Sequence, residues 1–499
     1  MRVSICNLTT EDILLSTNTA PILAPQSLLI TLPPVKANAQ FVLSTPHGDS
    51  EPLVVRLPNL RGTSWKAVLI PAHYPWRIYS TKVEPSHSKL LIIPRRNLTS
   101  FLSDMPDSLS LSALLLPGTH DTMAFYGWPI SQCQSLATPL ATQLQSGIRV
   151  IDIRLAVITT MSPSFTSSGI TDMAPTPKYE LVAYHGVFPQ RTPFPTILQT
   201  IYTFLTSPEG SRETIVMSIK QEDYAITPTE LFSRLVRETM MASPGGWSTS
   251  TNDTGMYFLQ NRIPQLGEVR GKVVLFSRFG GDGAEWDGGL EGIGIHPTTW
   301  PDSEKEGFDW ELKGTIVRTH DWYAVPSFLS IPEKVARATG VLLPPTCPQL
   351  TLSITYFSAA SFPFALPPTI ARGFGWPALG LGVEGVNTRV ARWLLDVLTG
   401  AEEKRIQNVK AKRRRPRWLR EHHEGLEPIP SEANLSVDVG EKGMQEFEQD
   451  VTRSLHAEEP RLRGWALMDY FTEPEGGNLV SLLVECNYRG RKVGEEGWQ

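Results

Sequence analysis

The feature that most restricts the fold of this chain is an alternation of short apolar runs with helix-length segments from Leu111 onward. The apolar runs lie at residues 111–116, 149–155, 180–186, 213–220, 271–278, 314–321, 350–358 and 464–471. Segments with a helical pattern lie between or after them, at residues 138–147, 195–207, 227–241, 387–400 and 478–490. Such alternation is typical of parallel strands joined by crossover helices. The eight runs therefore predict an α/β fold, a closed (β/α)8 barrel of the TIM type.

Residues 1–97 follow a different pattern. Short strand-like pieces recur there at a spacing of about ten residues, with Pro, Gly, Asn and Ser gathered between them. This pattern predicts a small all-β sandwich before the barrel. No titratable groups converge by spacing in this segment. We therefore expect residues 1–97 to be an accessory domain and residues 98–499 to be the barrel domain.

Residues 401–460 interrupt the alternation of the second region. This segment has few large apolar residues, begins with the basic stretch AEEKRIQNVKAKRRRPRWLR and continues as an acidic stretch that contains Pro and Ser. We expect a charged, solvated insertion between the seventh barrel helix and the last strand. The basic run Lys412–Arg417 is compatible with a nuclear localisation signal, with a patch for anionic lipids or with a soluble face.

The charge and the cysteines exclude several classes of partner. A net charge of -5 and a pI of about 6.1 provide no global attraction to nucleic acids, so local cations must hold any anionic ligand. The four cysteines are scattered and show neither C-x-x-C nor any other metal-ligand spacing, so the sequence suggests no zinc site and no disulfide framework. We expect reduced thiols at Cys6, Cys133, Cys347 and Cys486.

The sequence also bears on location. The N-terminus lacks a basic region followed by a long apolar core, and no run of about eighteen apolar residues occurs. We therefore expect a cytoplasmic protein that is peripheral at membranes, with neither a signal peptide nor a transmembrane segment.

Polar residues stand at or near the carboxyl end of almost every expected strand. In the stretch LLLPGTHDTM, Pro-Gly stops an apolar run, and His120 and Asp121 follow at once. The corresponding residues of the other strands are Asp152, Arg154, His185, Lys220 with Glu222 beyond it, Arg278, Asp321, Tyr323 and Asp469. Each alone is compatible with a capping group or an ion pair. Their recurrence at one rim of a barrel predicts an active site.

These side chains suit the cleavage of a phosphodiester by a hydroxyl nucleophile. One of the two imidazoles, His120 and His185, can take a proton from the attacking oxygen while the other gives one to the leaving oxygen. Arg154 can hold the non-bridging phosphate oxygens with two parallel hydrogen bonds. The carboxylates at the same rim can orient the imidazoles.

Several motifs of this region resemble those of bacterial phosphatidylinositol-specific phospholipases C, in the PLC-like phosphodiesterase superfamily. They are LPGTHDT, QLQSGIRVIDIRL, YHG, ETIVMSIKQE, GKVVLFSRF, HDWY, MDYF and NLVSLLVECNY. The resemblance covers roughly residues 105–400 and 461–490. It implies a phosphatidylinositol diacylglycerol-lyase, which cleaves phosphatidylinositol to diacylglycerol and inositol 1,2-cyclic phosphate.

Catalytic roles are implied by the resemblance residue by residue. It makes His120 the general base on the inositol 2-hydroxyl, with Asp469 hydrogen-bonded behind it. It makes His185 the general acid toward the diacylglycerol oxygen, supported by Asp121. The remaining catalytic positions are the phosphate clamp Arg154 and Asp152, which holds Arg154 in place.

The resemblance also implies which residues bind the inositol ring. These are Lys220, Arg278, Asp321 and Tyr323, the last of which can stack on the ring. The chain departs from the family's pattern at His320, next to Asp321, where it can alter contacts with sugar substituents. The preferred inositol lipid stays open.

Two positions in these motifs indicate whether the chain needs a metal cofactor. The calcium-dependent eukaryotic relatives show His-Asn at the first strand and acidic residues at alternate positions of the second. Here Asp121 replaces that Asn, and Arg154 stands where a carboxylate ligand would be. A guanidinium cannot share a site with Ca²⁺, whose ligands are oxygens. We therefore expect no metal and no other cofactor.

The expected partner is phosphatidylinositol or a related inositol phospholipid, reached by transient contact with a membrane surface. Tyr126 and Trp128 are candidates for that contact, with a core position as the alternative. Two other functions stay open. One is a glycerophosphodiester phosphodiesterase or other phospholipid phosphodiesterase, although the opening His-Arg-Gly signature is absent. The other is a catalytically silent lipid-binding scaffold, which the presence of both histidines and the arginine disfavours.

Overall fold

The computed structural model describes most of the chain. The described residues are 2–16, 22–23, 27–31, 40–45, 51–56, 65–84, 87–162, 165–166, 169–170, 176–248, 254–345, 350–363, 365–377, 381–400, 461–474 and 476–491. They divide into two compact units, one within Met1–Arg95 and Arg392–Pro460 and the other within Arg96–Ala391 and Arg461–Gln499. The predicted insertion at residues 401–460, including Lys412–Arg417, lies outside the described residues.

The first unit contains two β-sheets. One sheet has the strand order β4-β1-β9-β8-β7 and the other the order β3-β2-β5-β6. All pairs are antiparallel except β1 with β9. The strands are β1 (Arg2–Asn7), β2 (Ile13–Ser16), β3 (Ile22–Leu23), β4 (Ser27–Thr31), β5 (Gln40–Ser44), β6 (Leu53–Arg56), β7 (Lys66–Val68), β8 (Trp76–Glu84) and β9 (His87–Pro94).

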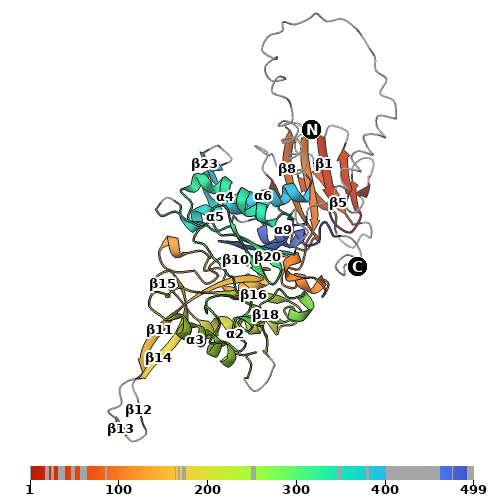
Figure 1. The fold of residues 1–499 in the computed structure, drawn as a ribbon. Coiled ribbons are helices and arrows are strands. Elements are labelled where there is room, and N and C mark those ends of the chain that lie inside the picture. Colours follow the sequence, from red (N-terminus) through yellow and green to blue (C-terminus); the bar gives the residue numbers. More distant parts are fainter. Residues whose placement is uncertain are drawn as a thin grey trace, which may run out of the picture. The chain divides into compact units, whose positions relative to one another are not determined.

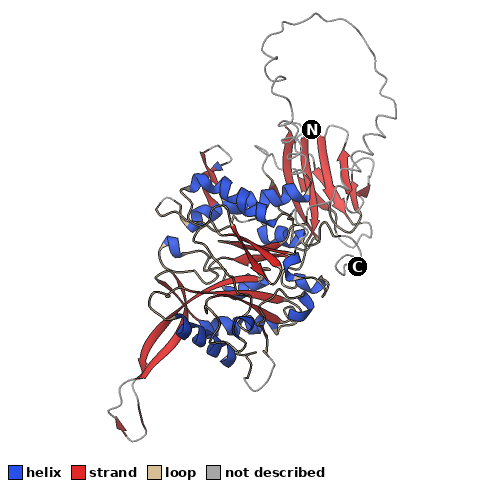
Figure 2. Cartoon of the chain, viewed as in Figure 1, coloured by secondary structure: helices blue, strands red, loops and turns tan. Residues whose placement is uncertain are grey.

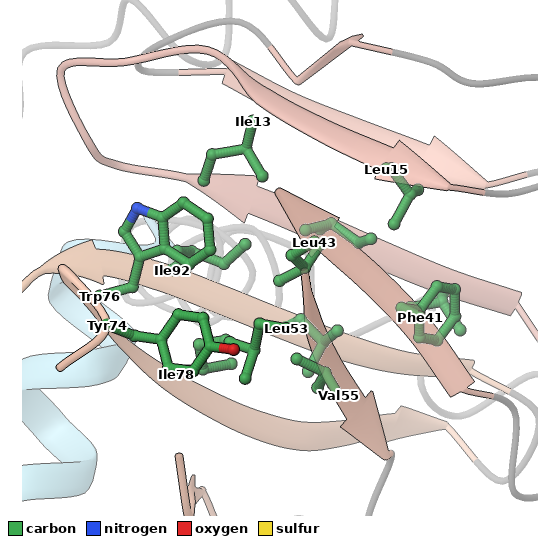
Figure 3. Packing of buried hydrophobic residues seen from close by; sticks show 13 residues of the cluster. Ile13, Leu15, Phe41, Leu43, Leu53, Val55, Tyr74, Trp76, Ile78 and Ile92 are labelled. Atoms are coloured by element: carbon green, nitrogen blue, oxygen red, sulfur yellow. The ribbon is translucent and has the colours of Figure 1, made fainter. Parts of the chain in front are cut away.

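Side chains from both sheets form one hydrophobic core in this unit. In β5, Phe41 and Leu43 are buried whereas Gln40 is exposed, which is the period of two that a strand with one buried face requires. Figure 3 shows these residues packed with the inward-facing side chains Ile13, Leu15, Leu53, Val55, Tyr74, Trp76, Ile78 and Ile92. The alternation of apolar and polar residues thus accounts for the packing of the two sheets.

The second unit is built around one curled, mostly parallel sheet with helices on both sides of its strands (Figures 1 and 2). The strand order is β17-β18-β16-β11-β10-β24-β21-β20-β19, and every neighbouring pair is parallel except β19 with β20. The strands are β10 (Leu115–Thr119), β11 (Val150–Ser162), β16 (Thr214–Gln221), β17 (Tyr257–Phe258), β18 (Lys272–Arg278), β19 (Phe308–Leu312), β20 (Thr315–His320), β21 (Thr351–Tyr356) and β24 (Gly464–Met468).

The central strands of this sheet are buried over almost their whole length. All residues of β10 and β24 are buried, and so are all but one of β16. Parallel strands are covered on both faces, which explains why these strands form unbroken apolar runs in the sequence. Because the strands are parallel, their carboxyl ends meet at one edge of the sheet.

The helices include every predicted helical segment. They are α1 (Leu140–Gln145), α2 (Phe194–Leu205), α3 (Thr229–Ala242), α4 (Ile331–Leu342), α5 (Pro367–Arg372), α6 (Val386–Leu398) and α9 (Leu479–Cys486), with short 3-10 turns at Phe101–Asp104, Leu111–Ala113, Pro129–Ser131, Leu266–Val269, Gly289–Glu291 and Phe328–Ser330. Helices α4 and α5 lie outside the predicted segments. In the described part of the chain, no helix combines the length and the apolar character needed to cross a bilayer.

One strand that was predicted to be parallel runs antiparallel to its neighbour in the sheet. Residues 180–186 were expected to form a parallel strand, but they fall largely in β14 (Thr176–His185), which pairs antiparallel with β11. A turn then leads into β15 (Phe188–Pro193), which pairs with β14. Figure 1 shows β11 and β14 extending together away from the rest of the sheet. An apolar run reveals that a strand is buried but not its direction, so the hairpin was not predictable from composition.

The sheet is curled without being closed by hydrogen bonds in the described residues. No strand pair there joins β17 or β18 to β20, and the two-residue β17 adds a parallel strand that the sequence pattern did not reveal. Two short hairpins complete the unit, formed by β12 (Phe165–Thr166) with β13 (Gly169–Ile170) and by β22 (Gly373–Trp376) with β23 (Leu381–Glu384).

A buried ion pair lies near the amino ends of two central strands. Arg149, directly before β11, and Glu213, directly before β16, are both 0% exposed, with 2.8 Å between Arg149 Nε and Glu213 Oε2. The guanidinium also donates to the carbonyls of Leu98, Thr99, Leu144 and Ile148. Glu213 accepts from the backbone N–H groups of Leu102 and Ser103. The pair therefore fastens residues 98–103 to the sheet.

Candidate active site

A cavity of about 1100 Å³ lies at the carboxyl ends of the parallel strands of the second unit. Eight of the ten predicted site residues line it, namely His120, Arg154, His185, Lys220, Arg278, Asp321, Tyr323 and Asp469. The other two, Asp121 and Asp152, are buried and form ion pairs with Arg154. The fold thus gathers residues that are up to 349 positions apart in the sequence.

The turn after β10 presents His120 and Asp121. Strands β10 and β11 approach closely at Gly118, where a Cβ atom would lie 2.8 Å from the Cβ of Val150, so only glycine fits. Asp121 has a φ of 42°, a left-handed conformation that aspartate adopts more readily than most residues. Gln143 braces the turn, because its Nε2 donates to the carbonyl of Thr122 at 2.9 Å.

His120 is held in one tautomer by its neighbours. Its Nδ1 lies 2.8 Å from Oδ1 of Asp469, and its Nε2 lies 2.8 Å from Nη2 of Arg154. Since a guanidinium can only donate, Nε2 accepts and the proton of the neutral ring lies on Nδ1. This arrangement suits an imidazole that takes up a proton at Nε2.

The surroundings of His120 favour the neutral form of its ring. Burial lowers its pKa well below 6.5, and the positive charge of Arg154 lowers it further. Burial also raises the pKa of Asp469, with the charge of Asp121 acting in the same direction. The carboxyl group behind the ring therefore depends on nearby cations for its ionisation.

His185 has a complementary arrangement at the end of β14. Its Nδ1 lies 3.1 Å from the carbonyl oxygen of Ser131, an acceptor, so Nδ1 carries a proton. Its Nε2 lies 3.4 Å from Oδ2 of Asp121. A second proton on Nε2 therefore has an acceptor in place, which is the arrangement of a proton donor.

Asp121 lies between the two imidazoles. Its Oδ2 is 3.3 Å from Nε2 of His120 and 3.4 Å from Nε2 of His185, without a well-formed hydrogen bond among the described residues. Burial raises the pKa of Asp121 to about 6, although Arg154 opposes that shift. One carboxylate oxygen thus faces both groups that can exchange protons.

Arg154, on β11, contacts three carboxylates. Its Nε lies 2.8 Å from Oδ1 of Asp121, its Nη2 lies 3.3 Å from Oδ2 of Asp152, and its Nη1 lies 3.3 Å from Oε1 of Glu222. Burial alone would lower the pKa of Arg154, but the three carboxylates raise it well above its usual value. The guanidinium is therefore a permanent cation in the middle of the site.

Glu222, which the sequence places beyond Lys220 at the same strand end, belongs to the site although no role in catalysis or binding was predicted for it. Its Oε1 accepts from Nζ of Lys220 at 3.2 Å, and its Oε2 accepts from the N–H of Gly186 at 3.2 Å. Burial would raise the pKa of Glu222, but Arg154 and Lys220 lower it. Lys220 and Glu222 are two positions apart at the end of a strand, a spacing that places both on one side and was available in the sequence.

A tryptophan joins Arg278 to Asp321 at the other side of the cavity. The guanidinium carbon of Arg278 lies 3.9 Å from the centre of the Trp300 ring, and Nε1 of Trp300 donates to Oδ2 of Asp321 at 2.9 Å. Tyr323 is 41% exposed and donates to Asp302. Trp300 and Asp302 lie in the loop after β18, where no periodic pattern singles them out, so sequence reasoning missed them.

His320 does not take part in the way expected from the sequence. It is 0% exposed and is absent from the cavity lining, so it does not reach a ligand in the cavity directly. The residue that follows it, Asp321, does line the cavity. Successive side chains of an extended segment point to opposite sides, so the side chains of His320 and Asp321 lie on different sides at the end of β20.

One trio of possible metal ligands occurs among the described residues, formed by His120, Asp121 and Cys133. Burial raises the pKa of the Cys133 thiol well above its usual value, so the thiol is not prepared as a ligand. The Arg154 guanidinium contacts both His120 and Asp121. The permanent positive charge of Arg154 therefore lies against two of the three possible ligands, and these residues do not fit a metal ion.

Comparison with known proteins identifies relatives of the chain. No protein-family model matches it. Over 191 residues it is 32% identical to the 1-phosphatidylinositol phosphodiesterase of Listeria monocytogenes, covering 36% of this chain and 48% of the relative. Over 208 residues it is 26% identical to the protein of the same name from Staphylococcus aureus strain Newman, covering 41% of this chain and 57% of the relative. Its relatives include bacterial 1-phosphatidylinositol phosphodiesterases.

These matches confirm the resemblance that the motifs predict. The chain spans about half the length of the 1-phosphatidylinositol phosphodiesterases that it matches. Solved structures of phosphatidylinositol-specific phospholipase C from S. aureus and from L. monocytogenes align with it at TM-scores of 0.46 and 0.41 and identities of 18% and 20%. Both alignments cover 78% of this chain, and they cover 98% and 99% of the solved chains.

Proposed function

We propose that this chain is a metal-independent phosphatidylinositol-specific phospholipase C, an enzyme that cleaves phosphatidylinositol to diacylglycerol and inositol 1,2-cyclic phosphate. The observation that carries the proposal is the position of Nε2 of His120 and Nε2 of His185 on either side of Oδ2 of Asp121. Arg154 contacts the same carboxylate through Oδ1. The names of the bacterial relatives agree with this chemistry.

The proposed reaction is a transfer within the substrate. The inositol 2-oxygen attacks phosphorus and forms the new O–P bond, while its proton moves to Nε2 of His120. The O–P bond to diacylglycerol breaks, and Nε2–H of His185 gives its proton to that leaving oxygen. The neighbouring hydroxyl attacks because it is held close to phosphorus, so the cyclic phosphate forms first.

Arg154 takes the part that a metal ion plays in other phosphodiesterases. Its planar guanidinium can hold two non-bridging phosphate oxygens and stabilise the negative charge that grows on them. The carboxylates Asp121, Asp152 and Glu222 keep the guanidinium charged and fix its orientation. A lysine would supply the charge but could not form two parallel hydrogen bonds to the phosphate oxygens.

The other side of the cavity suits a polyhydroxyl ring. Asp321 offers a carboxylate, Tyr323 offers an aromatic face and a hydroxyl, and Arg278 and Lys220 offer donors to ring oxygens. Trp300 fixes Arg278 and Asp321 relative to each other through its ring face and its Nε1. We assign this group to the inositol ring.

A set of exposed apolar side chains near the cavity supports contact with a lipid surface. They occur in loops that follow carboxyl ends of strands or in the turn after β14, and we call them the rim residues: Trp128, Val187, Tyr224, Ile226 and Phe362, which are 62%, 83%, 73%, 88% and 61% exposed. Tyr126, the other sequence candidate, is half-buried under the guanidinium of Arg191. We propose that the rim residues bring the cavity to the membrane as a peripheral contact.

The proposal also covers the architecture of the chain. We interpret the curled sheet as a variant of the (β/α)8 barrel in which the β14 hairpin replaces one parallel strand. Residues 98–499 would carry catalysis, and the sandwich of residues 1–97 would act as an accessory domain. Neither assignment changes the chemistry of the cavity residues.

The decisive experiment is incubation of the protein with phosphatidylinositol vesicles in excess chelator, followed by phosphorus NMR of the soluble product. We expect inositol 1,2-cyclic phosphate at the earliest times. Only acyclic inositol phosphate from the start, or activity that requires added calcium, would contradict the proposal.

A further inference from the structure

A buried tyrosine contacts two groups of the candidate active site. Tyr356 is the last residue of β21, is 1% exposed and is absent from the cavity lining. Its hydroxyl accepts a hydrogen bond from Nη1 of Arg278 at 3.3 Å. The centre of its ring lies 5.9 Å from the centre of the His120 imidazole, with the two planes at 85°. One side chain outside the cavity thus contacts a proposed inositol-binding residue and the proposed base.

The other contacts of Arg278 do not replace this hydrogen bond. The ring of Trp300 covers the guanidinium, whose central carbon lies 3.9 Å from the ring centre, but an indole has no acceptor. Oδ1 of Asp152 is 3.9 Å from Nη1 and accepts instead from Oγ of Ser218 at 3.2 Å. Among the described residues, the hydroxyl of Tyr356 is therefore the one acceptor that hydrogen-bonds this guanidinium.

The two contacts of the guanidinium restrain different motions. Stacking on Trp300 fixes the plane of the group, but the group can still turn within that plane. A hydrogen bond at one Nη atom stops this rotation. A guanidinium has five N–H donors, and Arg278 lines the cavity, so the donors that Tyr356 does not engage remain for a ligand. The hydroxyl of Tyr356 therefore sets the direction of these donors.

The ring of Tyr356 restrains the imidazole of His120 in a similar way. Hydrogen bonds from Asp469 and Arg154 engage the two ring nitrogens and lie in the plane of the ring, so they leave it free to tilt. A nearly perpendicular neighbour at this distance is a favoured arrangement of aromatic rings and opposes the tilt. When Arg154 turns to a phosphate, the contacts with Asp469 and Tyr356 remain.

Tyr356 is itself fixed by the fold. It is paired with Leu467 of β24 in the middle of the parallel sheet. Its ring centre also lies 6.1 Å from that of Trp300, with the planes at 89°. A residue held in this way can serve as a reference for the side chains that it contacts.

We propose that Tyr356 is a positioning residue of the active site, whose hydroxyl directs Arg278 toward the inositol ring and whose aromatic ring holds the plane of His120. The inference rests on the proposed function, in which Arg278 binds inositol and His120 takes the proton. The hydroxyl then acts on substrate binding, and the aromatic ring acts on the chemical step.

The first test compares Tyr356→Phe with Tyr356→Leu on a short-chain, monomeric phosphatidylinositol. Tyr356→Phe loses a hydrogen bond to a charged group and should raise KM about tenfold with kcat within about twofold. Tyr356→Leu also loses the ring and should lower kcat about tenfold in addition. The matched control is Tyr257→Phe, which should change neither constant, because Tyr257 is 0% exposed, outside the cavity lining and has its hydroxyl 3.0 Å from Oγ of Ser243. An unchanged KM in Tyr356→Phe, or equal kcat in the two variants, would overturn the proposal.

The second test asks whether the hydroxyl acts through Arg278. The affinity for myo-inositol is measured by NMR titration in the wild type, Tyr356→Phe, Arg278→Met and the double variant. We expect Tyr356→Phe to weaken binding about tenfold in the wild type and by less than about twofold in Arg278→Met, because residues that act together are not additive. Equal losses in both backgrounds would contradict the proposed role.

The third test needs neither turnover nor a ligand. Rotation of the Arg278 guanidinium about its Nε–Cζ bond is measured by NMR in ¹³C,¹⁵N-arginine-labelled protein, with Arg278→Lys to identify the signal. We expect rotation to be at least about threefold faster in Tyr356→Phe than in the wild type, because the hydrogen bond is lost. Equal rates would refute the role of Tyr356 and leave the proposed function standing. Absence of cleavage by the wild type would refute the proposed function, while the rotation rate stayed measurable.

Discussion

Nη2 of Arg154 lies 2.8 Å from Nε2 of His120, so the proposed phosphate clamp is hydrogen-bonded to the proposed base. The lone pair that must accept a proton is therefore engaged by the cation that must bind phosphate. A phosphate that draws the guanidinium toward itself frees Nε2 and moves a positive charge away from the ring. We therefore expect binding of the phosphate and activation of the base to be coupled through this one side chain.

This relationship predicts the direction of a change in the pKa of His120. Arg154→Met removes a charge that lowers this pKa, so the value should rise by about one unit or more. The measurement is ¹⁵N NMR of the histidine rings across pH. His296 is the internal control, because burial lowers its pKa without a contribution from Arg154. An unchanged titration of His120 would contradict the proposed coupling.

The two imidazoles should respond differently to the leaving group. His120→Ala and His185→Ala should each lower turnover of phosphatidylinositol by about a hundredfold or more, the contribution of a positioned base or acid. A synthetic inositol phosphodiester with a good leaving group needs little protonation. Its cleavage should therefore recover in His185→Ala and stay slow in His120→Ala. Equal recovery of both variants would show that the roles are misassigned.

The rim residues should affect the hydrolysis of phosphatidylinositol in vesicles but not the hydrolysis of a soluble substrate. The double variant Val187→Ser with Ile226→Ser should lower hydrolysis of phosphatidylinositol in vesicles by about tenfold, because apolar side chains drive binding at an interface. Hydrolysis of a short-chain, monomeric substrate should be unchanged. Leu350→Ser is the matched control, because Leu350 is 71% exposed but precedes β21, away from the carboxyl ends of the strands. An equal loss in the control would argue against the rim.

Glu213→Gln should destabilise the second unit strongly. It leaves the fully buried guanidinium of Arg149 without its charged partner, a change that typically lowers the free energy of unfolding by about 3–5 kcal/mol. Denaturant unfolding followed by tryptophan fluorescence provides the measurement. The exposed pair of Arg234 and Glu238 is the control, where Glu238→Gln should cost about 0.5 kcal/mol or less. A loss below about 1 kcal/mol for Glu213→Gln would contradict the structural role of the pair.

The fold was predictable where burial leaves a strong pattern in the sequence. Buried parallel strands such as β10 and β16 are nearly pure apolar runs, and α2 repeats buried residues at helical spacing. The direction of β14 was not predictable, because an antiparallel strand that packs on a sheet has the same apolar character. The open ends of the sheet at β17 and β19 also depend on long-range pairing that no local pattern encodes.

The site was predictable to the extent that its residues follow strands. His120, Lys220 and Asp469 stand at strand ends, where polar residues interrupt apolar runs. Trp300 lies in a long loop, and nothing near it in the sequence marks a site. Its hydrogen bond to Asp321 arises only when separate segments pack together.

His185 reaches the cavity on the return strand of a hairpin, whereas His120 and Asp469 follow parallel strands of the sheet. Strand β14 pairs with β11 from Leu155 to Ser162, so the place of the imidazole depends on the register at the base of the hairpin. Residues gained or lost in pairs at the far end would leave that register unchanged. In evolution, the imidazole of His185 can therefore stay fixed while the hairpin lengthens, shortens or acquires an inserted domain.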